Sequence, residues 1–256
     1  MGVFDVASPL FAWLDGLMSG VPDTVRLVLW AAVAGLASMA LYRVTSNQAK
    51  LTAIKADMAA LRQEIAAFDG PFSGMWKLVG RNLRLALRQL WVTFVPAVIA
   101  SVPVIFLLVW VSNSFDATMP APGEPVEVEA FAGDGETLPD LQWRGEGVRA
   151  QGDGTWTAAW PDAGRHLELL GEGDEVLLTL PPPAPIGVVH QRRWWNTLLG
   201  NPAGYLPPGP VDAVEINLPR REYLPFGPDW LRGWIPLFFA AVIAVSLLLK
   251  ILWRLH

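Results

Sequence analysis

The sequence predicts a mainly α-helical membrane protein with three transmembrane helices, a cytoplasmic helical coiled-coil hairpin, and a small external antiparallel β-sandwich-like domain. Hydrophobic residues make up 52% of the 256 residues and charged residues only 17%, and most of the apolar residues gather in three blocks. A heptad pattern follows the first block. A Gly- and Pro-rich region with strand-like alternation separates the second block from the third.

These patterns divide the chain into six segments. The expected order is an external interfacial helix, a first transmembrane helix, a cytoplasmic hairpin, a second transmembrane helix, an external β domain, and a third transmembrane helix with a cytoplasmic tail. Their ranges are residues 1–23, 24–43, 44–89, 90–112, 113–229 and 230–256.

The first segment carries an apolar face of a short helix. Leu10, Trp13, Leu14 and Leu17 fall on that face. Such a pattern favours a helix that lies along a membrane surface. A frayed, disordered terminus is the alternative.

The three apolar blocks are each long enough to cross a bilayer. The first has Gly35 and Ser38 on a small-residue face suited to close helix packing. The second contains Pro96 and Pro103, and each proline frees a backbone carbonyl that must find another partner. Thr93 and Ser101 are near enough to help. The second block is therefore expected to be a kinked helix beside a wet groove, or a simple proline-tolerant anchor.

The third block begins after a proline-rich approach and is framed by aromatic residues. Trp230 and Trp234 at one end and Trp253 at the other are expected to be interfacial anchors. Lys250 and Arg254 close the block with positive charge.

The hairpin is predicted from two different periodicities. Its first arm has a heptad seam that a break at residues 69–71 ends. Its second arm has a basic stripe and, on another face, an apolar repeat. The seam is Leu51, Ile54, Met58, Leu61, Ile65 and Phe68; the stripe is Lys77, Arg81, Arg84 and Arg88; the apolar repeat is Trp76, Val79, Leu83 and Leu87.

The region from 113 to 229 alternates with the period of a strand. Turn residues such as Gly152-Asp153-Gly154 separate the runs. The expected strands lie around residues 126–130, 155–160, 167–170, 176–180 and 211–218. Trp194 and Trp195 are assigned either to the membrane surface or to the sandwich core.

Chemistry-bearing residues are scarce. The chain has no cysteine, and neither His166 nor His190 has a partner at the spacing of a metal site or a catalytic triad. We therefore expect no catalytic residues, no metal, no cofactor and no enzymatic activity.

Charge is strongly segregated along the chain. Residues 43–88 hold eight basic and three acidic residues, a net charge of +5, whereas residues 113–230 hold seven basic and 18 acidic residues, a net charge of −11. The positive-inside rule then places the hairpin and the C-terminus in the cytoplasm, and the N-terminus and the β domain outside. A multi-pass protein of a bacterial inner membrane is expected.

The basic stripe of the hairpin has three interpretations. It attracts anionic lipid headgroups, it binds RNA or a ribosome through phosphate contacts, or it only fixes the topology. DNA is not an expected partner.

The order of parts, together with two local stretches, resembles the YidC-like membrane insertase superfamily. The likeness is closest to its small three-span branch, the archaeal insertase-like proteins and subunit three of the endoplasmic-reticulum membrane protein complex. The stretches are Thr45 to Ile65 (TSNQAKLTAIKADMAALRQEI) and Leu224 to Trp234 (LPFGPDWLRGW).

The resemblance implies an energy-independent insertase or membrane-protein folding chaperone. Its partners would be nascent membrane proteins and the lipid bilayer, with a ribosome or other membrane subunits as further partners. A hydrophilic groove would open to the cytoplasm, and its polarity here would come from Ser38, Thr93, Ser101, Ser246 and the carbonyls freed by Pro96 and Pro103.

The sequence departs from the family pattern in two places. Bacterial insertases place an arginine inside the first core span, whereas Arg26 lies at the end of this one. The acidic β domain is also absent from the archaeal relatives. The rival hypothesis is a membrane-anchored structural or adaptor protein that presents the β domain and the seam of residues 51–68 to partners.

Overall fold

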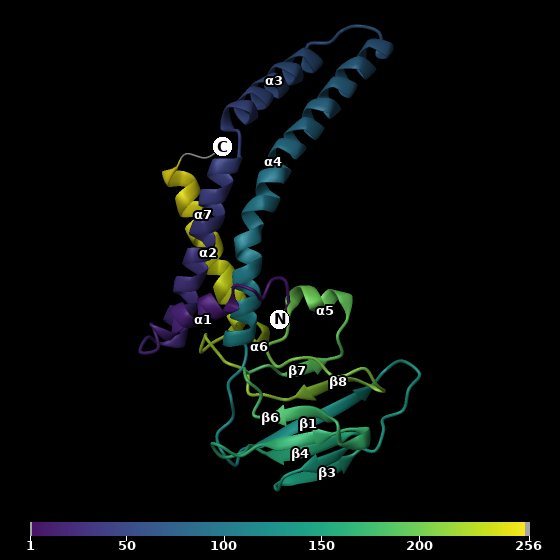
Figure 1. The fold of residues 1–256 in the computed structure, drawn as a ribbon. Coiled ribbons are helices and arrows are strands. Elements are labelled where there is room, and N and C mark those ends of the chain that lie inside the picture. Colours follow the sequence, from purple (N-terminus) through teal and green to yellow (C-terminus); the bar gives the residue numbers. More distant parts are fainter. Residues whose placement is uncertain (1, 254–256) are drawn as a thin grey trace. The chain divides into compact units, whose positions relative to one another are not determined.

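The computed structural model describes residues 2–253, and it divides into two compact units. The first, the β unit, comprises Met1–Val28 and Phe106–Phe238. The second, the helical unit, comprises Leu29–Ile105 and Phe239–His256. Figure 1 labels the elements of both. Arg254, expected to end the third block, lies outside the described residues.

Among residues 2–253, three helices are long and apolar enough to cross a membrane, as the sequence predicted. They are α2 (Asp23–Thr45), α4 (Phe72–Phe115) and α7 (Trp234–Leu252). By length and composition, they indicate a multi-pass membrane protein.

Helix α3 (Gln48–Ala66) begins and ends where local signals place it. The side chain of Asn47 accepts a hydrogen bond of 2.9 Å from the backbone N–H of Lys50, which caps the first turn. The helix ends before Asp69-Gly70-Pro71, and α4 starts at the next residue. The predicted break between two helical arms is thus confirmed.

Helix α4 runs through the boundary that the sequence placed between residues 89 and 90. It is one helix of 44 residues that includes both Pro96 and Pro103. At 1.5 Å per residue this is roughly 66 Å, about twice the thickness of a bilayer core. The helix is therefore continuous across the change in composition. Its basic first part suits water, and its apolar second part suits a bilayer.

The β unit contains two antiparallel sheets (Figure 1). One has the strand order β3-β4-β1-β8-β7 and the other β2-β5-β6. The strands are β1 (Pro125–Ala132), β2 (Gln142–Arg144), β3 (Val148–Gly152), β4 (Thr155–Ala159), β5 (Leu167–Leu170), β6 (Val176–Leu180), β7 (Val188–His190) and β8 (Val211–Ile216).

Both sheets contribute to a single hydrophobic core. Val128 and Val214 of the larger sheet and Leu169 and Leu180 of the smaller one are all fully buried. Alternate residues of β1 point into this core, so Glu127 and Glu129 lie on the opposite face. An antiparallel β domain is thereby confirmed, and all five predicted strands are present.

Three strands, two short α-helices and the 3-10 helix η1 (Glu172–Asp174) were not predicted. Strands β2, β3 and β7 have three to five residues each, and β3 has no buried residue to produce an alternating pattern. The helices are α5 (Trp194–Leu199) and α6 (Asp229–Arg232). Trp194 is 81% exposed and Trp195 40%, so neither belongs to the β core.

The N-terminal segment and the tryptophans give mixed outcomes. Helix α1 (Ser8–Gly16) forms within the predicted range, with Leu10 and Trp13 exposed on its surface. Trp230 is exposed as expected of an anchor, but Trp234 is buried. The indole N–H of Trp234 donates a hydrogen bond of 3.0 Å to Asp116, so this residue fixes local structure.

Candidate functional site

The six residues predicted to give a groove its polarity are spread over three helices. Ser38 lies on α2, Ser246 on α7, and the other four on α4. Pro96 is buried, whereas the other five side chains are half-buried. Among the described residues, no hydrogen bond joins one of the six to another.

The two hydroxyl groups of α4 bond to their own helix. Thr93 donates to the carbonyl of Gln89 at 3.0 Å, and Ser101 donates to the carbonyl of Val98 at 2.8 Å. The carbonyls that the two prolines leave free belong to residues 92 and 99, four positions before each proline. The expected compensation by Thr93 and Ser101 is therefore wrong.

The small-residue face of α2 contacts α7 within the helical unit. A Cβ atom on Gly35 would lie 3.2 Å from the carbonyl oxygen of Val242 and 3.2 Å from Val245 Cγ1. This distance is shorter than an ordinary van der Waals contact, so α7 would have to move by a few tenths of an ångström to admit a Cβ atom. The predicted suitability of this face for close packing is confirmed.

The apolar seam of α3 is buried within the helical unit. Leu51, Ile54 and Leu61 are at most 3% exposed, and Met58 is half-buried. An ion pair joins the two arms, from Arg81 on α4 to Glu64 on α3 at 3.4 Å. Both side chains are more than half exposed, so this pair contributes little to stability.

In the arm of α4, the more buried face is not the one that carries the apolar repeat. The apolar repeat of that arm is exposed, with Trp76 at 64%, Leu83 at 59% and Leu87 at 50%. Half-buried positions recur instead at spacings of three and four. They are Met75, Leu78, Asn82, Leu85 and Gln89. The exposed repeat that contains Trp76, Val79 and Leu83 is therefore not the surface that buries the seam of α3.

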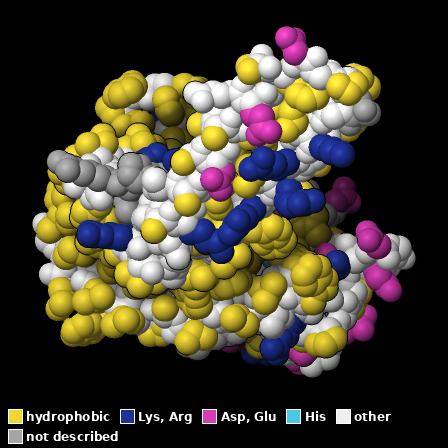
Figure 2. Space-filling model, turned by 90° about the horizontal axis from the view of Figure 1, so that it is seen from above, with side chains coloured by type: hydrophobic (Ala, Val, Ile, Leu, Met, Phe, Trp, Pro, Cys, Tyr) yellow, Lys and Arg dark blue, Asp and Glu magenta, His cyan; other side chains and the backbone are white. Residues whose placement is uncertain are grey.

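The exposed side chains of α4 form a continuous apolar stripe, which we name the α4 stripe. It runs from the start of the helix into the apolar span at steps of three or four residues. Its members are Phe72, Trp76, Val79, Leu83, Leu87, Leu90, Phe94, Val98, Val102 and Ile105. In Figure 2, which views the end that carries the α3–α4 connection, hydrophobic and basic side chains lie next to each other.

The basic residues of the arm occupy a separate exposed face. Lys77, Arg81, Arg84 and Arg88 are all exposed and follow one another at steps of four, three and four. At 100° per residue this face is about a third of a turn from the α4 stripe. The arm therefore offers an apolar surface and a cationic surface at the same time.

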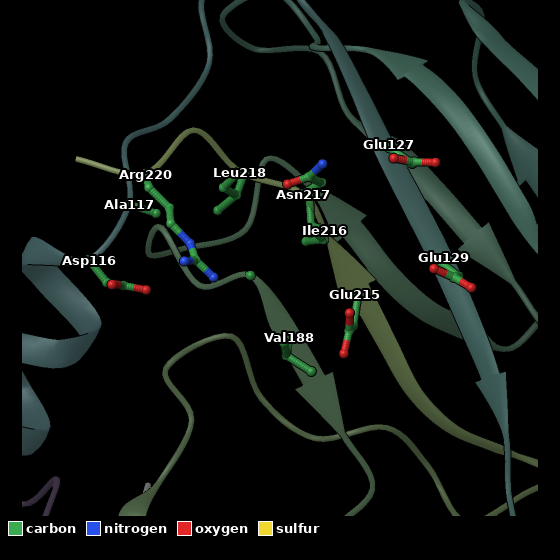
Figure 3. Close-up of a pocket in the computed structure, with 11 residues that line it drawn as sticks. Asp116, Ala117, Glu127, Glu129, Val188, Glu215, Ile216, Asn217, Leu218 and Arg220 are labelled. Atoms are coloured by element: carbon green, nitrogen blue, oxygen red, sulfur yellow. The ribbon is translucent and has the colours of Figure 1, made fainter. Parts of the chain in front are cut away.

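An acidic pocket of about 350 Å³ lies on the outer face of the larger sheet in the β unit. Figure 3 shows Glu127 and Glu129 on β1 and Glu215 on β8 along this face, with Asp116 and Arg220 at one end. Glu129 is directly opposite Glu215 in the strand register. Like charges in such a pair destabilise a sheet. The stability of the sheet therefore does not explain why acidic residues gather on this face.

A network of arginine and aspartate side chains joins distant parts of the β unit. Arg26 contacts Asp15 at 3.1 Å and Asp23 at 2.6 Å, and Arg221 contacts the other oxygen of Asp23 at 2.7 Å. The Arg26 guanidinium also lies over the ring of Phe115, 5.5 Å from its centroid. We call Asp15, Asp23, Arg26 and Arg221 the arginine–aspartate network.

The chain enters and leaves the β strands beside this network. The N–H of Arg221 donates to the carbonyl of Asp116 at 2.9 Å, and the hydroxyl of Tyr223 donates to the carbonyl of Phe115 at 2.7 Å. Burial raises the pKa of Tyr223 to about 12, against the smaller opposing effect of Arg221. The phenol is therefore held neutral as a hydrogen-bond donor.

A cavity of about 640 Å³ opens next to the network, and Asp5, Ser8, Arg26 and Arg221 help to line it. Asp5 is only 4% exposed. Its position is set by two hydrogen bonds from residues 3 and 4 to the end of α5. Gly2 and Gly200 allow this approach, because a Cβ on Gly2 would lie 2.1 Å from the nitrogen of Gly200.

Most of the residues that line this cavity could not be predicted from the sequence. Arg26 and Asp23 are three residues apart on one helix, a spacing that predicts an ion pair. Arg221 has no such local signal, since its partner Asp23 is 198 residues away along the chain, and Asp5 lines the same cavity without any spacing that links it to Arg221. Only the fold brings them together.

The histidines remain apart from other candidate ligands. His190 contacts the ring of Trp195, with centroids 5.7 Å apart, and His166 is exposed. Within residues 2–253, no group of three or more His, Asp or Glu side chains has the geometry to hold a metal ion.

Comparisons with known proteins give no relative for this chain. No family model, curated protein or solved structure matches it.

Proposed function

We propose that the protein is an energy-independent membrane protein insertase or membrane-protein folding chaperone. The observation that carries the proposal is the α4 stripe, because it offers one uninterrupted apolar surface from the arm of the hairpin to the apolar span. A hydrophobic segment of a nascent protein must leave water before it reaches the bilayer core. A surface of this kind covers the segment at each stage of that transfer.

The cationic face of the arm supports the same function. It is exposed beside the stripe and is able to contact ribosomal RNA or anionic headgroups through phosphate oxygens. In this proposal α3 and the α4 arm form a coiled-coil hairpin in the cytoplasm. The chain lies in a bacterial inner membrane with its N-terminus and β domain outside and its C-terminus inside.

Site-specific crosslinking tests the proposal directly. A photo-crosslinking residue at Leu83 or Trp76 is expected to capture nascent membrane proteins stalled on ribosomes. A probe at Lys55, which is equally exposed on α3 but off the stripe, serves as the matched control. Equal capture from Lys55 and Leu83, or none from either, contradicts the proposal.

Probes in the span test the predicted groove. Thr93 and Ser101 are the positions to label, because they lie on α4 within the apolar block.

Depletion of the protein is expected to lower the membrane content of small multispan proteins. An unchanged membrane proteome, together with no crosslinks from Thr93 or Ser101, argues against an insertase.

One observation favours a second candidate, a membrane-anchored adaptor. The acidic face of Glu127, Glu129 and Glu215 suits a basic partner of the β domain. In that case, replacing Glu127, Glu129 and Glu215 together by Gln abolishes the cellular function of the protein. Replacing Trp76 and Leu83 by Ser leaves that function unchanged. The insertase proposal predicts the opposite ranking.

A further inference from the structure

Unsatisfied buried polar atoms concentrate at the cavity lined by Asp5. Six buried side-chain nitrogen or oxygen atoms lack a hydrogen-bond partner among the described residues. Four of the six belong to residues that line this one cavity: Asp5 Oδ1, Ser8 Oγ, Arg26 Nε and Arg221 Nε. Leaving such atoms unpaired in a buried place is unfavourable, so their shared location indicates a ligand.

The charges around the cavity define what that ligand carries. The network already pairs Arg26 and Arg221 with Asp15 and Asp23. Asp5 is a third carboxylate, and no ion pair among the described residues neutralises it. A buried carboxylate is stabilised by a cation that donates hydrogen bonds, such as a primary ammonium group.

The unused arginine nitrogens define a second part of the ligand. Each Nε–H is a donor without an acceptor, and both belong to permanently charged guanidinium groups. An anionic oxygen of a phosphate is the acceptor that arginine favours. The cavity is therefore complementary to a zwitterion that has an ammonium group and a phosphate diester.

The location of the cavity identifies the source of the zwitterion. Arg26 lies in the first turn of α2, and Trp110 and Asn113, which also line the cavity, lie near the end of α4. Both places are ends of apolar helices, where lipid headgroups lie. A volume of about 640 Å³ is within the range of small-ligand sites.

We propose that this cavity binds the headgroup of an ethanolamine phospholipid. Asp5, with Ser8 beside it, receives the ammonium group, and the Nε–H groups of Arg26 and Arg221 donate to the phosphate. The site does not depend on the insertase proposal. A lipid held there would fix the β unit to the bilayer surface.

Lipid binding to the purified full-length protein tests the site. The protein is placed in phosphatidylcholine nanodiscs that contain phosphatidylethanolamine or phosphatidylglycerol as a minor component, and the retained lipids are counted by native mass spectrometry. Phosphatidylethanolamine is expected to be retained preferentially. Asp5→Asn is expected to reduce this preference about tenfold, since it removes a charge-assisted hydrogen bond.

Two further variants control the measurement. Ser8→Ala is expected to weaken retention severalfold without changing the charge of the site, and Asp134→Asn, on an exposed turn, is expected to change nothing. Thermal unfolding of each variant in detergent verifies that it folds. If Asp5→Asn unfolds, Ser8→Ala carries the test.

The outcomes separate the proposal from its alternatives. Equal retention of phosphatidylglycerol, or retention that neither Asp5→Asn nor Ser8→Ala changes, overturns the ammonium site. Competition with soluble phosphoethanolamine distinguishes the two sources of the headgroup. Binding of the soluble compound without retention of the lipid overturns the lipid assignment and upholds the headgroup chemistry.

Discussion

At the scale of single residues, the arginine–aspartate network and Tyr223 hold together segments that are distant in sequence. Asp23 accepts from both Arg26 and Arg221, which are 195 residues apart. Tyr223 secures the end of α4 through the carbonyl of Phe115. Because these contacts are partly or fully buried, the loss of one partner leaves the other polar group without a hydrogen bond, and water cannot readily reach it to form a new one.

Tyr223→Phe is therefore expected to destabilise the β unit by about 1–2 kcal/mol at neutral pH, because it leaves the buried carbonyl of Phe115 unpaired. Thermal unfolding in detergent measures the loss against the wild type. Glu222→Gln, a change at the exposed neighbouring residue, is the control and is expected to have a small effect.

The raised pKa of Tyr223 makes this difference depend on pH. The folded pKa of about 12 lies above the unfolded value of 10, so the phenol's contribution is complete below pH 10. It is lost as pH rises from 10 towards 12. The stability of the wild type is expected to approach that of Tyr223→Phe over this interval, and a constant difference between them would contradict the assignment.

At the scale of elements, two glycines of the helical unit differ in how closely another helix packs against them. Gly35→Leu is expected to lower the unfolding temperature, because its side chain would enter the space occupied by Val242 and Val245 on α7. Gly80→Ala is the matched change, since no atom lies within 4 Å of a Cβ at that position. It is expected to stabilise α4 by about 0.5–1 kcal/mol.

The two apolar faces of the hairpin are expected to respond differently to truncation. Leu61→Ala removes a side chain that is 1% exposed and is expected to cost about 2–4 kcal/mol. Leu83→Ala removes one that is 59% exposed and is expected to cost little stability while reducing capture of nascent chains. Hydrogen exchange of α3 measures the first effect. Equal loss of protection in both variants would show that the α4 stripe is not a free surface.

The elements that the sequence predicted are those with strong local signals. Helix α3 has an Asn cap and a proline-marked end, and β1 has clean alternation of buried and exposed residues. Strands β2 and β7 have three residues each and exist because longer neighbours pair with them. No periodicity extends over so short a run.

The inward face of the α4 arm was missed for a related reason. Hydrophobicity alone favoured the repeat that contains Trp76 and Leu83, but that repeat is exposed. The half-buried face includes the polar residues Asn82 and Gln89, which a search for apolar periodicity passes over. An exposed apolar patch also occurs where a protein binds a partner, so hydrophobicity alone does not identify the interior.

At the scale of the whole molecule, the orientation in the membrane decides which surface meets which partner. The hairpin carries a net charge of +5 and the β domain a net charge of −11. These charges favour opposite sides of a membrane whose cytoplasmic face is negative. The insertase proposal requires α3 and the α4 arm to be cytoplasmic, because only there could the α4 stripe meet a nascent chain.

The lack of cysteine makes this orientation directly measurable, since any cysteine introduced into the chain is unique. Gln63→Cys on α3 and Asp134→Cys in the β domain are both exposed. In intact bacterial cells with a permeabilised outer membrane, a membrane-impermeant maleimide is expected to label Asp134→Cys and leave Gln63→Cys unmodified. In inverted inner-membrane vesicles the pattern is expected to reverse. Labelling of Gln63→Cys in intact cells would place the stripe outside, and the insertase proposal would then fail while the lipid site at Asp5 could still be tested.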